Sequence, residues 1–382
     1  MSFSFSFSGD DIEEQDNGGV EQLNQVGEKT ETAAAGSQPA QAGAFPVEGK
    51  PQLPVIRHDL DTMLSLLPSK VSYDLLEVKL DDGRTISLPR RELWDVRVQL
   101  MAEDDGEEGP TEGLGVRDVK TGVYEGGFKS WESSVDLVKV LASQGYASDG
   151  NERPLRVLEL GCGTALPSLS LFQSAVSVRS SSATQTSPAP APAPLSILLA
   201  DYNPSVLQLV TLPNFVLTWA LQVADTEPAL KEAFAREDEL ELTDEVKEAF
   251  RRFLPSAGIT LDWISGGWSE EFVDAVYAET AQPEPSASAG TLILGAETIY
   301  SPFALESFHQ TVSKILQRER ARNPDRDAEA LVGAKRMYFG VGGSLDDYVA
   351  RARDAGALVE QLREETEGVS RGVVRCKLIA GP

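Results

Sequence analysis

The sequence predicts an α/β protein with a doubly wound, Rossmann-like parallel sheet, and three observations support this class. Apolar runs of strand length alternate with longer amphipathic stretches, as in successive β-α-β units. The apolar run 155–160 ends in a Gly-Cys-Gly turn that opens a helix. Two further runs end in acids, Asp201 and Glu297. In such sheets the ligand crevice lies at the carboxyl ends of the strands, so these residues are candidates for one site.

Composition limits what the chain can be. Its 382 residues allow one or two domains, and 41% are hydrophobic, enough for a sizeable core. No apolar run is long enough for a membrane span, and the N-terminus lacks the blocks of a secretory signal. Two cysteines and two histidines indicate no metal site and fit a reducing compartment. The net charge of −26 argues against direct nucleic acid binding and would favour a basic protein partner, although solubility alone explains it equally well.

Three segments are expected along the chain. Residues 1–50 are rich in Gly, Ser, Gln, Ala and acids, which predicts a disordered acidic tail. Residues 51–120 are predicted to form an N-terminal accessory segment, with a short helix from His58 and a hairpin around the turn Asp82-Gly83. The main domain is expected over 121–382. Its predicted surface insertions, two Pro/Ser/Ala tracts and a charged helical stretch between them, lie near 180–194, 224–252 and 281–290.

The expected elements of the accessory segment and main domain follow from apolar periodicity. The predicted strands are 71–80, 85–88, 155–160, 195–201, 259–264, 291–297, 336–341 and 370–379. The predicted helices of the main domain are 132–141, 166–176, 204–212, 215–221, 303–321 and 345–366, with a break at 213–214.

The glycine turn selects among possible ligands. Gly161 and Gly163 let the backbone come close to a ligand because they carry no Cβ. A dinucleotide fingerprint has Gly or Ala at its sixth position, where this chain has Leu166, and no Gly-Lys-Ser/Thr of a P-loop follows. With dinucleotides and P-loop nucleotides excluded, the turn is expected to bind a ligand without phosphates. Glu159 suits the ammonium of a methionine moiety in such a ligand. A glycine turn that binds no ligand is the alternative.

An acid that binds ribose hydroxyls is expected about 20 residues after the glycines. Asp201 follows Gly161 by 40 residues, and 25 remain when the 15-residue tract 180–194 is set aside as an insertion. The excess spacing between Gly161 and Asp201 is therefore explained by a segment that looks inserted, which strengthens the assignment of Asp201 as the ribose-binding acid.

Together these strand ends resemble the seven-β-strand S-adenosylmethionine-dependent methyltransferases. The resemblance narrows to the protein-histidine methyltransferases that modify a large-subunit ribosomal protein, and it covers about residues 51–382. It is carried by five strings, namely 126–132 (Gly-Gly-Phe-Lys-Ser-Trp-Glu), 201–203 (Asp-Tyr-Asn), 265–268 (Ser-Gly-Gly-Trp), 296–300 (Ala-Glu-Thr-Ile-Tyr) and 338–343 (Tyr-Phe-Gly-Val-Gly-Gly).

The resemblance implies a cofactor, S-adenosylmethionine, and a set of residues around it. Trp131, Glu132 and Ser133 would line the methionine end of the cofactor, and Glu159, Gly161 and Gly163 would form the turn beneath it. Asp201, Tyr202 and Asn203 would hold the ribose. Gly267 and Trp268 would border the adenine, and Ala296 would lie by the sulfonium. Relatives often carry an acid where this chain has Gly267, so the adenine amino group would need another acceptor.

In the implied reaction the side chains mainly position the nucleophile in line with the activated methyl group. A histidine with an unperturbed pKa near 6.5 is roughly three quarters neutral at pH 7, whereas lysine, near 10.4, needs far more help to lose its proton. A histidine site needs an acceptor on the second ring nitrogen, and Glu297 or Tyr300 could supply it. The plain alternatives are a helix cap for Glu297 and a site wall for Tyr300.

The expected function is therefore a protein-histidine N-methyltransferase acting on a basic large-subunit ribosomal protein. A protein-lysine methyltransferase of the same fold and a non-catalytic binding protein are the alternatives. We expect a monomer without direct nucleic acid or membrane binding, and the family implies a location in cytoplasm and nucleus.

Overall fold

The computed structural model describes residues 46, 48–104, 126–146, 153–182, 193–278, 289–322, 324, 326–340 and 342–378. Most of the predicted tail, the acidic loop after Glu103 and most of the insertions at 180–194 and 281–290 lie outside the described residues. Everything described belongs to the unit Ala40–Pro382.

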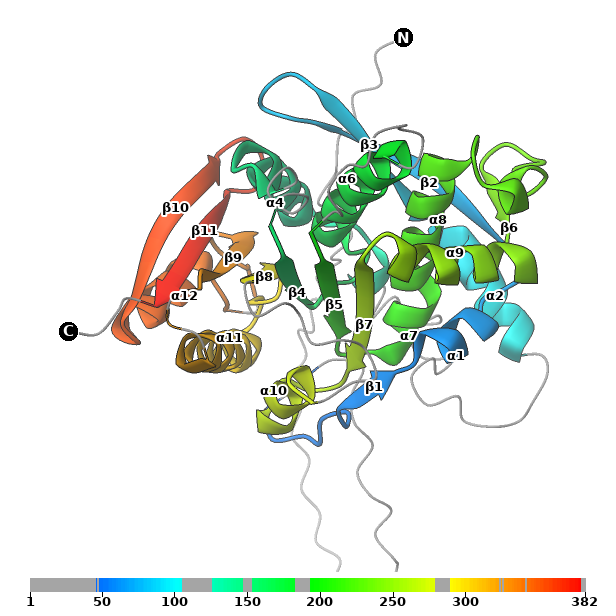
Figure 1. Cartoon of the computed structure of the whole chain (residues 1–382). Coiled ribbons are helices and arrows are strands. Elements are labelled where there is room, and N and C mark those ends of the chain that lie inside the picture. The colour runs from blue at the N-terminus through cyan, green and yellow to red at the C-terminus, as the bar shows by residue number, and fades with distance from the viewer. Residues whose placement is uncertain are drawn as a thin grey trace, which may run out of the picture. The chain divides into compact units, whose positions relative to one another are not determined.

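The main sheet has eight strands in the order β1-β7-β5-β4-β8-β9-β11-β10 (Figure 1). From β7 to β9 all neighbours are parallel, whereas β1, β11 and β10 each pair antiparallel with their neighbours. This confirms the doubly wound α/β class, with β1 added as an eighth strand to the seven of the main domain. The strands are β1 (Ile56–His58), β4 (Leu155–Leu160), β5 (Leu195–Asp201), β7 (Ile259–Ser265), β8 (Gly290–Ala296), β9 (Ala328–Lys335), β10 (Ala357–Glu365) and β11 (Arg371–Leu378).

Helices cover both faces of this sheet because successive strand residues point to opposite faces. Val157 and Leu199 belong to one buried cluster, and their chain neighbours Leu158 and Leu198 to another. Figure 1 shows α4 and α6 on one side of the strands and α10 and α11 on the other. The helices are α1 (Leu60–Ser65), α2 (Leu93–Asp104), η1 (Gly126–Phe128), α4 (Glu132–Ser143), α6 (Leu166–Ser182), α7 (Pro204–Val206), η2 (Leu207–Thr211), α8 (Leu212–Val223), η3 (Pro228–Leu230), α9 (Asp244–Ser256), α10 (Glu270–Val276), α11 (Pro302–Arg322) and α12 (Leu345–Asp354).

A second sheet of three strands joins the accessory segment to the stretch 224–252. The predicted hairpin is present as β2 (Lys70–Lys79) and β3 (Thr85–Arg91), and β2 also pairs with β6 (Glu239–Glu241). The stretch 224–252 was expected to be a solvated helix. It instead contains a strand, and Leu240 and Phe250 are fully buried, because its few apolar residues pack against the hairpin and α8.

The predicted break at Pro213-Asn214 is wrong. Residues 204–223 form one continuous helical stretch, in which Pro213 comes directly after the π turn η2 and the first residue of α8. This stretch is long and apolar enough to span a membrane, yet 83% of its most apolar window is buried inside the fold. Its apolar character is therefore that of a core helix.

Two C-terminal predictions are also wrong. The strand expected at 336–341 lies earlier, as β9 (Ala328–Lys335), because small apolar residues form the buried strand and the aromatic residues after it form a loop. The helix expected over 345–366 ends at Asp354, and β10 follows. As the edge strand, β10 has no buried residue, and it lacks the apolar alternation that identifies a strand from sequence.

Candidate active site

The carboxyl ends of β4, β5, β7 and β8 meet at one edge of the sheet. The strands are parallel neighbours, with Asp201 opposite Ser265 and Glu159 opposite Leu199. The loops that follow them carry the glycine turn, the Asp-Tyr-Asn string, Trp268 and the segment from Ala296. The predicted cofactor residues thus come from adjacent loops.

The glycine turn packs tightly between two other loops. Gly161 and Gly163 both have positive φ, at 67° and 51°. A Cβ at Gly161 would lie 2.8 Å from Cγ2 of Thr298, and one at Gly163 would lie 3.1 Å from the carbonyl oxygen of Gly127. Larger residues at either position would displace the turn, so packing within the protein itself requires glycine here.

Asp201 ties the glycine turn to the turn after β5. Its carboxylate accepts hydrogen bonds from the backbone N–H of Gly163 at 3.1 Å and of Asn203 at 3.2 Å. Burial raises the pKa of Asp201 to about 6, and these hydrogen bonds act in the opposite direction. A buried carboxylate beside a glycine turn is suitably placed to accept hydrogen bonds from ligand hydroxyls.

Glu159 lies below the turn and bonds to protein. It is 2% exposed, and its Oε2 accepts a hydrogen bond from the backbone N–H of Ser168 at 2.9 Å. This bond satisfies an unpaired donor in the first turn of α6. Burial raises the pKa of Glu159 to about 7. Its described contact is therefore a helix cap, whereas the sequence predicted contact with a ligand ammonium.

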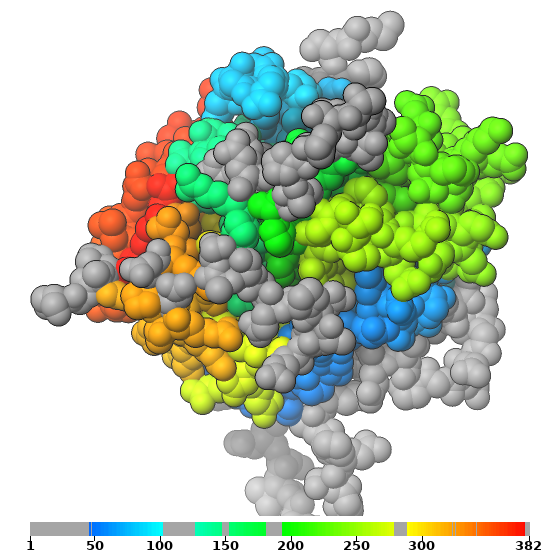
Figure 2. Space-filling model, in the orientation of Figure 1, coloured from blue at the N-terminus to red at the C-terminus, as the bar shows by residue number. Residues whose placement is uncertain are grey.

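The segment 52–55 crosses the ends of β5 and β7 and covers Gly267. The backbone N–H of Leu53 donates to the Tyr202 hydroxyl at 3.0 Å, and the carbonyl of Leu53 accepts from the N–H of Gly267 at 3.0 Å. A Cβ at Gly267 would lie 2.9 Å from Cβ of Gln52. Farther along, Arg57 donates to the carbonyl of Ala275, and Figure 2 shows this blue N-terminal chain against the yellow-green chain around α10. The accessory segment thus packs against the loops that carry Tyr202 and Gly267.

Glu297 is the centre of a second cluster. It has a positive φ of 56°, which is uncommon for a residue with a side chain. Its Oε1 accepts a hydrogen bond from the Ser133 hydroxyl at 2.5 Å, and its Oε2 accepts one from the Tyr338 hydroxyl. Burial raises the pKa of Glu297, while the two hydroxyls and Lys335 act to lower it. This acid is held by side chains from both α4 and the loop after β9.

Aromatic side chains and a cation border this cluster. The Lys335 ammonium lies 5.2 Å from the centre of the Trp131 ring and 5.7 Å from that of Tyr338. Trp131 precedes α4 and is 39% exposed, and the charge of Glu132 acts to raise the pKa of Glu297. The predicted residues 131–133 therefore lie beside Glu297.

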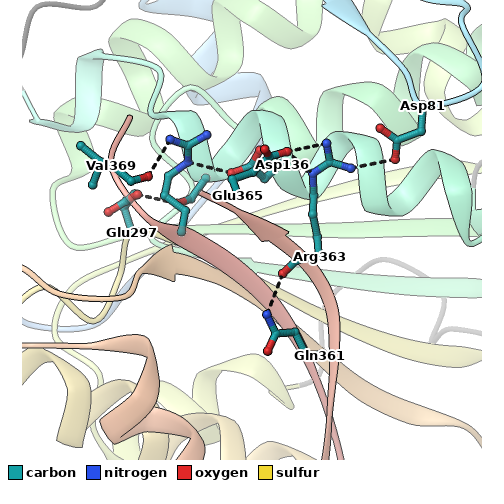
Figure 3. Close-up of polar contacts among 9 residues, drawn as sticks. Asp81, Asp136, Glu297, Gln361, Arg363, Glu365 and Val369 are labelled. Atoms are coloured by element: carbon teal, nitrogen blue, oxygen red, sulfur yellow. Dashed lines mark hydrogen bonds and ion pairs between the residues drawn. The ribbon is translucent and has the colours of Figure 1, made fainter. Parts of the chain in front are cut away.

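A charged cluster anchors α4 behind these residues. Asp136, 2% exposed, accepts from Arg371 at 2.9 Å and lies 3.7 Å from Arg363. Arg363 also pairs with Asp81 of the β2–β3 hairpin at 2.7 Å (Figure 3). The N-terminal hairpin, α4 and the C-terminal hairpin are joined in this way.

Sequence reasoning missed Tyr338 as a site residue. The signal was its place in the string 338–343, one of the strings that carry the resemblance, but residues 336–341 were assigned to a strand. Among the described residues, Ser133 and Tyr338 hold Glu297, and Tyr300 does not appear with them. Burial and the charge of Asp201 raise the pKa of Tyr300 to about 12, so it stays neutral.

Two buried polar atoms beside the turn have no hydrogen-bond partner among the described residues. They are Nε1 of Trp268 and Oγ1 of Thr298. Both side chains lie against the position of a Cβ at Gly161, and the Trp268 ring packs edge-on against Phe308, with ring centres 5.4 Å apart. Buried polar groups are normally paired. A polar ligand group at this turn would fit the unpaired Nε1 of Trp268, whereas Oγ1 of Thr298 lies 3.3 Å from the position of a Cβ at Gly295.

The sheet order and the glycine turn at the end of its central strand define a Rossmann-like α/β protein. No protein-family model matches the chain. It is 34% identical to histidine protein methyltransferase 1 of Saccharomyces cerevisiae over 93% of this chain and 91% of that protein. Identity to histidine protein methyltransferase 1 of Schizosaccharomyces pombe is 30% over 85% of each. The chain therefore belongs to the histidine protein methyltransferase 1 family.

Two solved structures of methyltransferases resemble parts of the chain at low sequence identity. A precorrin-6y C5,15-methyltransferase from Geobacter metallireducens has a TM-score of 0.31 and 12% identity, covering 69% of this chain and 97% of that one. A magnesium protoporphyrin IX methyltransferase from Synechocystis, solved with bound S-adenosylmethionine, has a TM-score of 0.30 and 11% identity, covering 74% and 91%.

Proposed function

We propose that this chain is a protein-histidine N-methyltransferase that takes its methyl group from S-adenosylmethionine. The observation that carries the proposal is the meeting of the glycine turn, Asp201, Trp268 and Glu297 at one edge of the sheet, in a chain of this family. Its substrate would be a histidine of a basic large-subunit ribosomal protein. The net charge of −26 is compatible with a basic partner, which it would attract at long range.

The cofactor would be held by residues from the four strand ends. We assign the ribose to Asp201, Tyr202 and Asn203, and the adenine to Gly267 and Trp268, whose unpaired Nε1 supports a polar ligand there. Trp131, Glu132 and Ser133 would border the methionine end, Gly161 and Gly163 would lie beneath it, and Ala296 would adjoin the sulfonium. Glu159 would act indirectly, by fixing the start of α6. When bound, the cofactor supplies a methyl group that is already activated on a sulfonium sulfur.

The protein's contribution is to place a neutral imidazole in line with that methyl group. An acceptor for the second ring nitrogen keeps the reacting nitrogen free of its proton. Glu297 is a carboxylate at the end of β8, beside the partly exposed Trp131, and we assign it this role. Tyr300, neutral and half-buried, would be a wall of the site.

The enzyme would act on its substrate as a monomer in cytoplasm and nucleus, without nucleic acid or membrane. The test incubates the full chain with labelled S-adenosylmethionine and large-subunit ribosomal proteins from cells that lack the enzyme, and mass spectrometry locates the label. Label on histidine is expected. Label on lysine would favour the lysine methyltransferase of the same fold. No label, together with no heat of cofactor binding in isothermal titration, would leave a non-catalytic binding protein.

A further inference from the structure

Glu297 is held more firmly than a helix cap or a site wall requires. Its two carboxylate oxygens take hydroxyl donors from elements far apart in the sequence, Ser133 at the start of α4 and Tyr338 in the loop after β9. Its backbone N–H donates to the carbonyl of Gly333 at 3.0 Å. Side chain and backbone are both fixed, in a conformation with positive φ.

The carboxylate nevertheless keeps capacity for another partner. An ionised carboxylate offers about four acceptor sites on its two oxygens, and Ser133 and Tyr338 use one on each oxygen. The torsion that turns a glutamate carboxylate is broad in an unrestrained side chain. Two donors on opposite oxygens remove that freedom, so the remaining acceptor directions are fixed in space.

We propose that Ser133 and Tyr338 are positioning residues. They would fix Glu297 so that its carboxylate accepts the N–H of the non-reacting ring nitrogen of the target histidine, and so decide which of the two nitrogens is methylated. This inference rests on the proposed function and deepens it.

The choice of nitrogen follows from the tautomer. In a neutral imidazole one nitrogen carries the proton and the other has the lone pair that attacks. A fixed acceptor selects the tautomer and the ring orientation together. The attacking nitrogen forms the new N–C bond with its lone pair, the cofactor sulfur keeps the electron pair of the broken S–C bond, and the ring cation gives its N–H proton to Glu297. The raised pKa of Glu297 suits it to take that proton.

The test measures the ratio of the two methylhistidine isomers in substrate hydrolysed after reaction. Wild type is expected to form one isomer. Tyr338→Phe and Ser133→Ala each remove one donor, and we expect the isomer ratio to fall by about tenfold or more, with a larger effect on kcat than on KM. Glu297→Gln, which turns one acceptor into a donor, should also form both isomers.

A matched control is Tyr146→Phe. It breaks a comparable hydrogen bond, from the Tyr146 hydroxyl to Glu329 at 2.6 Å, and should leave the isomer ratio unchanged. Cofactor titration verifies that each of the three site variants is folded. If one variant does not fold, the isomer ratios of the other two test the inference. A purely structural role would lower activity without changing the ratio. An unchanged ratio in the folded variants overturns the inference, whereas the absence of methylhistidine with wild type overturns the proposed function.

Discussion

The Ser133 hydroxyl lies 2.5 Å from the Glu297 carboxylate, although 164 residues separate the two in the sequence. The approach depends on Gly333 of β9, the strand beside β8. A Cβ at Gly333 would lie 3.0 Å from the carbonyl oxygen of Ser133 and 3.2 Å from Cγ of Leu137. The missing side chain lets the start of α4 lie directly on the sheet, where Ser133 reaches Glu297.

Gly333→Ala should therefore displace the start of α4. Overpacking a tight contact typically costs 1–3 kcal/mol, so we expect a melting temperature lower by several degrees and a clear loss of methyl transfer. Differential scanning fluorimetry and the labelled-cofactor assay measure both. Gly290→Ala is the control, because its Cβ would meet only an ordinary contact of 3.6 Å with the carbonyl of Asp327. Equal effects of the two changes would contradict the explanation.

Asp201→Ala should weaken cofactor binding roughly 10- to 100-fold, the typical worth of hydrogen bonds to a charged group. The change removes the assigned ribose acceptor and also the bridge from Gly163 to Asn203. Isothermal titration with S-adenosylmethionine gives the Kd. The exposed Asp225→Ala should leave it unchanged. Wild-type affinity in folded Asp201→Ala would refute the ribose assignment.

Glu159 should make stability depend on pH. Burial raises its pKa from 4.5 to about 7, so between these values the folded state binds more protons than the unfolded state. The free energy of unfolding must then fall as pH rises from about 4.5 to 7, by about 3 kcal/mol at most, and level off above. Glu159→Gln keeps an acceptor for Ser168 and should show a flatter melting-temperature profile over this range. Parallel profiles for the two proteins would count against a buried, titrating Glu159.

Tyr202→Phe should loosen the segment 52–55. The change leaves the backbone N–H of Leu53 without its acceptor, which typically costs about 1 kcal/mol and corresponds to roughly fivefold faster amide exchange. Hydrogen exchange with mass spectrometry on the peptide around Leu53 measures this. Tyr277→Phe, whose hydroxyl donates to Glu319 at 2.7 Å, is the control. Unchanged exchange at Leu53 would show that the carbonyl contact with Gly267 is enough to hold the segment.

Two truncations should behave differently. The described contacts of the N-terminal segment with the sheet begin at Gln52, so removing residues 1–45 should leave methyl transfer intact. Removing 1–58 also deletes β1, the Arg57–Asp262 ion pair at 3.1 Å and the cover over Gly267. We expect lower thermal stability and weaker cofactor binding for the second truncation alone. Lost activity in a folded 46–382 chain would show that the first 45 residues are needed.

Local pattern was enough to predict most of the fold. Buried parallel strands such as β4, β5 and β8 are rich in Leu, Ile and Val, and each ends within one residue of its predicted boundary. Asp201 was assigned across a 15-residue tract because insertions leave the order of strand and acid unchanged. The sequence pattern did not predict β10, whose residues lack apolar alternation, and it placed Tyr338 in a strand because Met337, Tyr338 and Phe339 are typical of strands.

The sequence by itself determined the doubly wound sheet, the glycine turn and the strand ends that carry the candidate site residues, because each depends on periodicity and turn residues within a few positions of one another. Tertiary structure alone decided that Glu159 caps α6, that the segment 52–55 covers Gly267, and that Ser133 and Tyr338 hold Glu297. Those contacts depend on how strands and helices pack in space, and no local pattern specifies which distant side chain will meet a given carboxylate.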